Sequence, residues 1–256
     1  MIAKTSPTFT IITVTYNSVH TLERTILSVL NQSFTDFEYI IIDGGSQDGT
    51  LDMIKRYSDY ITYWISEPDF GIYDAMNKGI KQANGEFIGF LNSDDWYEVD
   101  TLKDVFQNID NDVDVLYGNI IYENDQLKVS YPTFNTETMN DHMTLFHPST
   151  FVRTRIYKLF KFNLKYKIVS DWDFFIRIVQ TRKYNFKYIN KVLSHFSVDG
   201  ISQKISIKLL VEKNKLRFKY SDHRYRLLFK DLIVYMLLKM NLLKIYHFIK
   251  YKTNIY

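Results

Sequence analysis

The 256-residue chain contains no cysteine. This absence excludes disulfide bonds, a thiolate nucleophile and cysteine-ligated metal sites, and it agrees with a reducing compartment. No stretch reaches the roughly 18 apolar residues of a membrane-spanning helix; the longest uncharged run near the C-terminus is Leu232–Leu238. The N-terminal residues also lack the apolar core and cleavage site of a secretory signal. We therefore expect a cytoplasmic protein.

Two common nucleotide-binding motifs are missing as well. No Gly-x-Gly-x-x-Gly follows a predicted strand, and no Gly-x-x-x-x-Gly-Lys-Ser/Thr occurs. A Rossmann-type dinucleotide site and a P-loop are therefore not expected. The six histidines form no His-x-x-His or His-Glu-x-x-His metal motif. Any phosphorylated ligand must be held in another way.

The charge is divided unevenly along the chain. The formal net charge is +3, but residues 204–256 carry 13 Lys/Arg and three Asp/Glu, which leaves −7 on residues 1–203. We expect a globular domain over 1–203 and a basic, aromatic-rich helical extension over 204–256. Apolar residues lie between the cations of the extension, which favours a membrane surface over nucleic acid as its partner. The alternative is a terminal helix pair packed on the domain.

The body of the chain alternates between strand and helix patterns. The expected strands are 9–15, 37–43, 61–65, 85–91, 113–117 and 186–195, with a hairpin through 120–122 and 127–130. The expected helices include 26–30, 50–57, 72–83, 102–108 and one that Ser170 or Asp171 would cap, while 133–167 has an irregular pattern. Alternation of this kind predicts an α/β fold with a mainly parallel sheet flanked by helices.

Polar residues follow three of the predicted strands directly. They are Asn17, Asp43 and the Asp94-Asp95 pair. In parallel sheets, ligands bind beyond the carboxyl ends of the strands. Adjacent carboxylates suit Mg²⁺ or Mn²⁺, which usually share their coordination shell with phosphates, so group transfer from a nucleotide fits better than hydride transfer. A solvated turn is the alternative for an isolated Asp-Asp pair.

Five ordered segments resemble one known family. They are Ile11–Asn17 (IITVTYN), Ile41–Thr50 (IIDGGSQDGT), Asp69–Gly79 (DFGIYDAMNKG), Phe90–Asp95 (FLNSDD) and Ser170–Arg177 (SDWDFFIR). Together, over residues 8–203, they resemble family 2 glycosyltransferases of the GT-A fold. The resemblance implies an inverting enzyme that uses Mg²⁺ or Mn²⁺. Its donor would be a nucleotide-diphosphate sugar, most of all a UDP-sugar, and its acceptor a hydroxyl of a glycan or lipid-linked glycan.

The resemblance also implies a cellular role and a set of donor-site residues. The role is capsule, exopolysaccharide or lipopolysaccharide assembly at the inner face of a bacterial membrane. The donor site would comprise Thr15, Tyr16, Asn17, Asp43 facing the base, Gly45, Ser46, Asp48, Asp74, Lys78, Asn92, Ser93 and Asp95. A carboxylate at Asp43 can accept the imide N–H of uracil. The alternative for Asp43 is a helix or turn cap, and for Asp48 it is an ordinary Asp-Gly turn. The alternative for Asp74 and Lys78 is a surface i,i+4 pair.

The chemistry is assigned on the same resemblance. Asp94 would hold the metal, with Asp199 as a second ligand where many members have histidine. Asp171 would be the base that deprotonates the acceptor; the alternative is a carboxylate that caps the helix and favours its N-terminus. His147 and Trp172 would contact the acceptor. Two substitutions depart from the family pattern: Asn92 stands at a common aspartate position, and Ser170 replaces the glutamate of the Glu-Asp motif.

Two other functions remain open from the sequence. A sugar nucleotidyltransferase also combines an α/β sheet with a carboxylate-bound metal, and it would release pyrophosphate. The chain could also be a GT-A protein that binds a sugar nucleotide or glycan with little turnover, which Asn92 and Ser170 would explain. Nucleic acid is not an expected partner of the protein under any of these functions.

Overall fold

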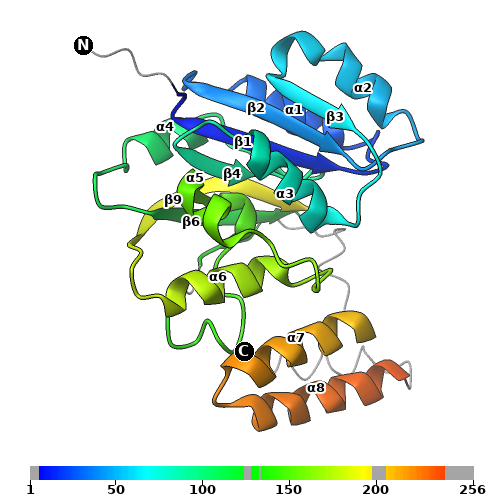
Figure 1. Ribbon diagram of the computed structural model, residues 1–256, viewed down its shortest axis with the longest axis vertical. Coiled ribbons are helices and arrows are strands. Elements are labelled where there is room, and N and C mark those ends of the chain that lie inside the picture. Colours follow the sequence, from blue (N-terminus) through cyan, green and yellow to red (C-terminus); the bar gives the residue numbers. More distant parts are fainter. Residues whose placement is uncertain (1–5, 124–127, 133, 198–205, 240–256) are drawn as a thin grey trace.

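The computed structural model describes residues 6–123, 128–132, 134–197 and 206–239. Its first half is a parallel sheet in the order β3-β2-β1-β4 (Figure 1), formed by β1 (Phe9–Thr15), β2 (Phe37–Asp43), β3 (Tyr63–Ser66) and β4 (Phe87–Phe90). Runs of β-branched and aromatic residues suit these buried strands. The parallel βα pattern predicted for this half is confirmed.

The second half turns the sheet into a mixed one. Beyond β4 the order continues β8-β6-β9-β5, and β7 pairs with β6. The strands are β5 (Trp96–Tyr97), β6 (Val115–Glu123), β7 (Lys128–Ser130), β8 (Thr150–Arg153) and β9 (Phe186–Ser197). β8 is antiparallel to both β4 and β6, while β9 is parallel to β6. The predicted hairpin is confirmed, but its first strand is continuous with 115–117 across a register shift at Gly118–Asn119.

The prediction of an irregular region over 133–167 was wrong in part. This region contains β8, the 3₁₀ helix η2 (His147–Ser149) and the helix α5 (Thr154–Phe160). The two-residue strand β5 was also not predicted. Because β5 and β8 are short and pair with strands distant in sequence, the local residue pattern does not predict them.

Helices cover both faces of the sheet. One face packs against α1 (Leu22–Leu30), α2 (Thr50–Arg56) and α4 (Thr101–Phe106), and the other against α3 (Ile72–Gln82), α5 and α6 (Ser170–Gln180). Strand residues alternate accordingly, with Ile11 and Ile41 on the first face and Ile12 and Ile42 on the second. A further 3₁₀ helix, η1, spans Ser58–Tyr60.

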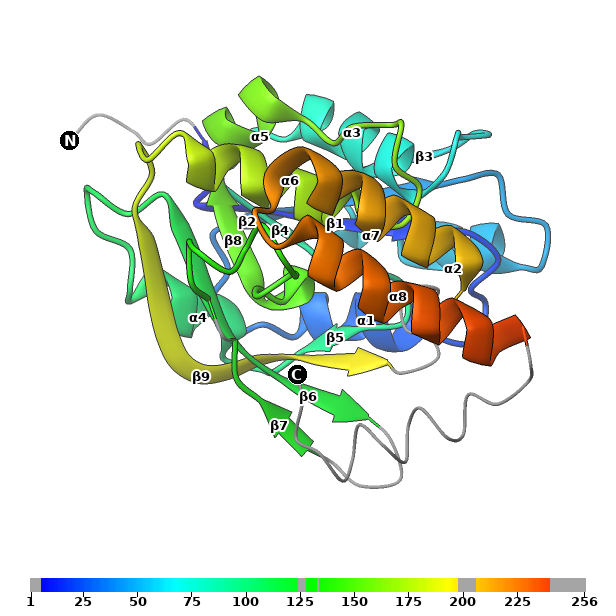
Figure 2. The ribbon, with the colours of Figure 1, turned by 90° about the horizontal axis from the view of Figure 1, so that it is seen from below.

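The helical extension is a hairpin of α7 (Ile207–Tyr220) and α8 (Arg224–Lys239), and Figures 1 and 2 show α7 between α6 and α8. Leu209 and Leu216 of α7 belong to the same core cluster as α3 and α6. The predicted boundary at 203/204 falls outside the described residues. Among the described helices, none is long and apolar enough to cross a membrane.

Candidate active site

The carboxyl ends of β1 and β2 bring the first two predicted loops together. Thr15 lies opposite Asp43 in the ladder, and Asp43 lies opposite Ser66 of β3. Asn17 adopts a left-handed conformation with φ of 49°, which asparagine tolerates better than most residues. Its backbone N–H donates to Ser46 Oγ at 2.7 Å, and its Oδ1 accepts the N–H of Gln47 at 2.9 Å. Beside them, Tyr16 is 62% exposed.

Asp43 is fully buried and organises the second loop. Its Oδ2 accepts the N–H groups of Gly45 at 3.2 Å and Ser46 at 3.0 Å and the hydroxyl of Ser66 at 2.5 Å. Its Oδ1 accepts the hydroxyl of Ser46. A carboxylate has about four lone-pair sites, two on each oxygen, so Oδ1 retains capacity for one further donor. The geometry therefore shows a loop anchor, and the contact with a base remains a prediction.

Asp48 and Ser93 connect neighbouring loops. Asp48 Oδ2 accepts the N–H of Val19 at 3.1 Å, and its Oδ1 accepts the N–H of Thr50 at 3.0 Å. Ser93 donates to Ser18 Oγ at 2.9 Å. The loops after β1, β2 and β4 thus form one hydrogen-bonded unit at the carboxyl edge.

The acidic loop after β4 contains one buried and one peripheral carboxylate. Asp95 is 1% exposed, and it accepts the N–H of Ser197 at 3.1 Å and the side-chain amide of Asn92 at 3.3 Å. Burial, together with the nearby Asp94, raises the pKa of Asp95 well above its usual range. Arg24 donates to the backbone carbonyl of Asp94 at 3.3 Å, and its guanidinium lies 3.4 Å from the centre of the Trp96 ring. Arg24 therefore fixes the loop from α1.

The oxygen atoms of this loop are suitable ligands for a divalent cation whose coordination shell also includes phosphates. Asn92 Oδ1 is buried and finds no partner among the described residues. With the Asp94 carboxylate it offers hard oxygen ligands, and Mg²⁺ needs only one or two protein carboxylates when phosphates complete its shell. Within the described ranges, no group of three or more His, Asp or Glu is arranged to hold a metal by itself. Asp199 lies outside them.

The segment before α3 joins the second loop to the region of Asp171. A Cβ added to Gly44 would lie 2.5 Å from Asp69 Oδ2, so a larger residue at this position would displace the Asp69 carboxylate. The next residue, Phe70, is 79% exposed, and its carbonyl accepts Lys167 Nζ at 2.6 Å. Asp74 accepts the N–H of Phe70 at 3.2 Å. Residues 69–71 therefore lie between Gly44 and the chain that leads into α6.

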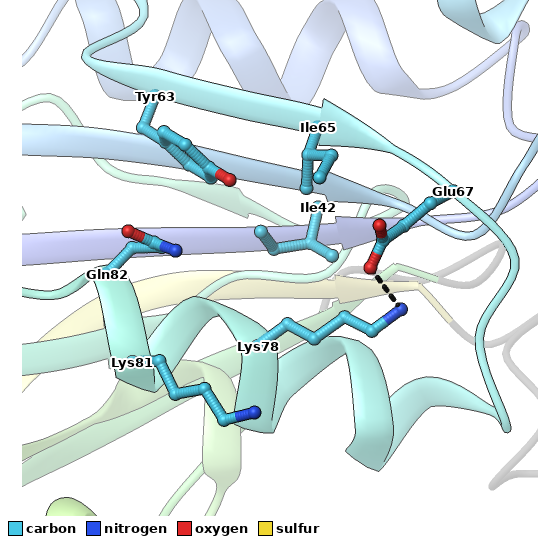
Figure 3. A pocket seen from close by; sticks show the side chains of 7 residues that line it. All are labelled: Ile42, Tyr63, Ile65, Glu67, Lys78, Lys81 and Gln82. Atoms are coloured by element: carbon cyan, nitrogen blue, oxygen red, sulfur yellow. Dashed lines mark ion pairs between the residues drawn. The ribbon is translucent and has the colours of Figure 1, made fainter.

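Lys78 lies at a pocket of about 230 Å³ between β3 and α3 (Figure 3). The pocket is lined by Ile42, Tyr63, Ile65, Glu67, Lys78, Lys81 and Gln82. The ammonium of Lys78 points at Glu67, 2.7 Å away, and lies 3.8 Å from Asp74. Both acids compensate its charge, so Asp74 and Lys78 form the i,i+4 pair that was the alternative, and their contact with a donor stays a prediction. This pocket does not include Asp43, Asp94 or Asp171.

Asp171 stands in the first turn of α6 and faces α3. Tyr73 Oη lies 2.8 Å from Asp171 Oδ1 and 2.8 Å from the carbonyl of Ile168. Burial and the Asp171 charge raise the pKa of Tyr73 well above its usual range, so its hydroxyl remains a donor. The predicted cap was wrong: Val169 is the N-cap residue, and Ser170 is the first helical residue, with its hydroxyl bound to the carbonyl of Asn163.

The two predicted acceptor residues are packed against the interior. His147 lies among the rings of Phe90, Phe162 and Phe175, and burial lowers its pKa. Its Nε2 is buried without a partner among the described residues. Trp172 is 2% exposed and donates its indole N–H to the carbonyl of Met139 at 2.6 Å. Trp172 therefore has no free polar group for an acceptor, because that N–H is already used in the core.

Sequence reasoning missed several residues of this region. Tyr73 lies inside the segment Asp69–Gly79, one residue before Asp74, but its contact with Asp171 spans 98 residues and has no local signal. Arg24 offered no signal, because an arginine on an exposed helix face is ordinary. Asp69 was also within a quoted motif, and its approach to Gly44 depends on the fold of two loops.

A family model for glycosyl transferase family 2 matches residues 10–193. The chain belongs to glycosyl transferase family 2. It is 30% identical over 202 residues to a PGL/p-HBAD biosynthesis glycosyltransferase of Mycobacterium bovis, with 76% of this chain and 78% of the relative covered. An uncharacterized glycosyltransferase of Methanocaldococcus jannaschii is 27% identical, with 90% and 88% covered. The chain is thus a glycosyltransferase.

Solved structures confirm the GT-A fold. Staphylococcus aureus TarS 1–349 in complex with UDP-GlcNAc matches with a TM-score of 0.65 at 21% identity, over 88% of this chain and 71% of TarS 1–349. The chain spans 42% of the longer TarS chain, with a TM-score of 0.66 at 22% identity. A Pyrobaculum calidifontis mannosyltransferase with GDP-Man and Mn²⁺ matches with a TM-score of 0.57 at 16% identity, over 87% of this chain and 64% of that one.

Proposed function

We propose that this glycosyltransferase moves a sugar, with inversion, from a nucleotide-diphosphate sugar to a hydroxyl of a glycan or lipid-linked glycan. The observation that carries the proposal is the meeting of the predicted loops at one edge of the sheet, with Asp171 beside the first turn of α3. UDP is the preferred nucleotide, because a carboxylate such as Asp43 can accept an imide N–H. Cell-surface polysaccharide assembly is the proposed setting.

Asp171 is the proposed base. Its carboxylate removes the proton of the acceptor hydroxyl while that oxygen attacks the anomeric carbon. The bond between the anomeric carbon and the diphosphate oxygen breaks, the nucleoside diphosphate leaves, and the proton stays on Asp171. Because the displacement is direct, no covalent enzyme intermediate is required. Tyr73 holds the carboxylate in place by its hydroxyl.

Asp94 and Asn92 are the proposed holders of Mg²⁺ or Mn²⁺. A bound divalent cation supplies Lewis-acid stabilisation of negative charge on a departing diphosphate. Asp95 is buried behind this loop, and its hydrogen bonds to Asn92 and Ser197 hold the loop against β9. Asp95 is therefore proposed to position Asn92, with a donor-sugar contact remaining a prediction.

A screen of nucleotide sugars tests the function. Thermal stabilisation is measured with UDP-glucose, UDP-galactose, UDP-N-acetylglucosamine and GDP-mannose, with and without Mn²⁺, since a ligand that binds the native state raises apparent stability. We expect at least one UDP-sugar to stabilise the protein, more so with Mn²⁺, and slow release of UDP and free sugar. Release of pyrophosphate in the presence of a sugar phosphate and UTP would favour a nucleotidyltransferase instead.

The extension is proposed to lie on an anionic membrane surface. Tyr225, Phe229 and Met236 of α8 are 73%, 66% and 51% exposed. Such apolar side chains with interspersed cations suit an interface with anionic lipids. The full chain should sediment with phosphatidylglycerol vesicles and be released by salt. Combined serine substitution of Phe229, Leu232 and Ile233 should abolish this sedimentation. Leu159→Ser, which changes a 71% exposed leucine of α5, should not; equal sedimentation of both variants would reject the proposal.

A further inference from the structure

Glu212 is an unusual residue in the extension. It is the one acidic residue of α7, in a helix that carries five Lys/Arg, yet it is only 6% exposed. Buried carboxylates are costly unless they are hydrogen-bonded or paired. Glu212 also lies beyond residues 10–193, the part of the chain that the family model matches. Its burial therefore calls for a partner in the body of the protein.

That partner is the backbone that leads to Asp171. The two carboxylate oxygens of Glu212 accept the N–H of Lys167 at 3.0 Å each, and Oε2 accepts the N–H of Ile168 at 2.8 Å. Charge-assisted hydrogen bonds of this kind are among the stronger ones in proteins. They hold two consecutive peptide groups three and four residues before Asp171.

One face of α7 extends this attachment along α6. Leu209, Glu212, Leu216 and Tyr220 are spaced three or four residues apart, so they share one side of the helix. Leu209 and Leu216 enter the core, and Tyr220 Oη lies 3.4 Å from Asp173 Oδ1. Figures 1 and 2 show α7 directly beside α6. The extension therefore contacts the start of α6 both before and after Asp171.

Ile168 links Glu212 to the proposed base. Its N–H is held by Glu212, and its carbonyl lies 2.8 Å from Tyr73 Oη, the same oxygen that lies 2.8 Å from Asp171 Oδ1. A tyrosine hydroxyl has a single proton, so the carbonyl of Ile168 and the carboxylate of Asp171 compete for it. The position of Ile168 relative to Tyr73 then governs how the hydroxyl is shared.

We propose that Glu212 is a positioning residue for Asp171, so that the C-terminal helix α7 takes part in building the active site. This inference rests on the proposed role of Asp171 as base. Glu212 does not touch the reacting atoms. It fixes Ile168, which fixes the geometry between Tyr73 and Asp171.

The test combines two substitutions of Glu212 with a matched control. Glu212→Ala removes every acceptor, whereas Glu212→Gln keeps one oxygen that both N–H groups can reach. Glu38→Ala is the control, because Glu38 is 7% exposed and accepts the N–H of Asn84 at 2.5 Å and of Gly85 at 3.1 Å. It is a similar buried clamp on consecutive peptide groups, located at the amino ends of the strands.

Nucleoside diphosphate release is measured in the full chain with the four nucleotide sugars named above. We expect Glu212→Ala to lower kcat about tenfold or more with little change in the donor KM. Glu212→Gln should retain most of the activity, and Glu38→Ala should lose stability with kcat within about twofold of wild type. Equal losses of kcat in Glu212→Ala and Glu38→Ala would overturn the inference.

A double-mutant cycle with Tyr73→Phe provides the second readout. If Glu212 acts through Ile168 and Tyr73, the effects of Glu212→Ala and Tyr73→Phe on kcat are not additive. Additive effects would contradict the inference. If the alanine variant does not fold, Glu212→Asp takes its place in the cycle, because its shorter side chain draws the carboxylate away from the N–H groups of Lys167 and Ile168.

The outcomes separate this inference from the proposed function. Full activity of Asp171→Asn would reject the base, and the inference with it. An inactive Asp171→Asn beside a fully active Glu212→Ala would reject the inference alone. If the wild type cleaves none of the four donors, hydrogen exchange tests whether Glu212 holds the backbone before α6. The amides of Lys167 and Ile168 must then exchange faster in Glu212→Ala than in wild type, and at the wild-type rate in Glu38→Ala.

Discussion

Removing the hydroxyl of Tyr73 tests the organisation of the active site most sharply. The hydroxyl lies 2.8 Å from both Asp171 Oδ1 and the carbonyl of Ile168, and Tyr73 is 6% exposed, so Tyr73→Phe leaves the ring in place and removes only the donor. A hydrogen bond to a charged group contributes roughly 1.5 to 3 kcal/mol. If about half of the upper value acts on the transition state, the rate falls about tenfold, since 1.36 kcal/mol is a factor of ten.

We therefore expect kcat to fall about tenfold in Tyr73→Phe while the donor KM stays within about twofold. Steady-state release of nucleoside diphosphate from the most active nucleotide sugar measures both. Burial and Asp171 raise the pKa of Tyr73 well above its ordinary value. A raised pKa favours the protonated form of tyrosine, so the hydroxyl stays a donor below about pH 9 and the rate ratio should not change with pH there.

Tyr157 provides the control for this substitution. It is fully buried in the same aromatic cluster, and its hydroxyl has no hydrogen-bond partner among the described residues. Tyr157→Phe therefore removes the same atom without removing a bond, and we expect kcat within about twofold of wild type. Unchanged kcat in Tyr73→Phe, or equal losses in both variants, would refute the reasoning.

Three further predictions follow from the loops and the extension. Asp94→Asn should abolish the extra thermal stabilisation that Mn²⁺ gives in the presence of UDP, whereas Asp52→Asn, whose side chain is 83% exposed, should retain it; retention in Asp94→Asn would remove the metal role. Asp43→Asn should weaken nucleotide binding about tenfold by calorimetry, because an amide oxygen cannot accept all four hydrogen bonds that Asp43 receives from Gly45, Ser46 and Ser66; unchanged affinity would contradict the anchoring role. Removal of residues after 203 should lower the free energy of unfolding by at least about 3 kcal/mol in urea, because Leu209 and Leu216 leave the core at about 1.5 to 3 kcal/mol each; an unaltered midpoint would show that α7 does not stabilise the body.

The parallel half of the fold could be predicted because its signals are local. Phe9–Thr15 and Phe37–Asp43 are runs rich in apolar and β-branched residues that lead into polar loops. This local pattern predicts both the strand and the place where it ends. β8 was missed because a four-residue strand depends on pairing with β4 and β6, which lie far away in the sequence. The gathering of loops was predicted from the same strand ends.

The interior of the site was less predictable than its loops. The burial of Asp43, the packing of Trp172 and the bond between Tyr73 and Asp171 depend on contacts between segments from 23 to 98 residues apart. Glu212 is the clearest case, because its role depends on a helix outside the recognised motifs packing against α6. Composition indicated a basic extension but could not indicate which face it buries.

The assignment of Asp171 as base is tested most directly by Asp171→Asn. The substitution keeps the size of the side chain and removes the proton acceptor. Measured with the most active nucleotide sugar, donor affinity should stay within about twofold of wild type while nucleoside diphosphate release falls by about two to four orders of magnitude, the range that general base catalysis supplies. Release at the wild-type rate with intact donor binding would contradict the account.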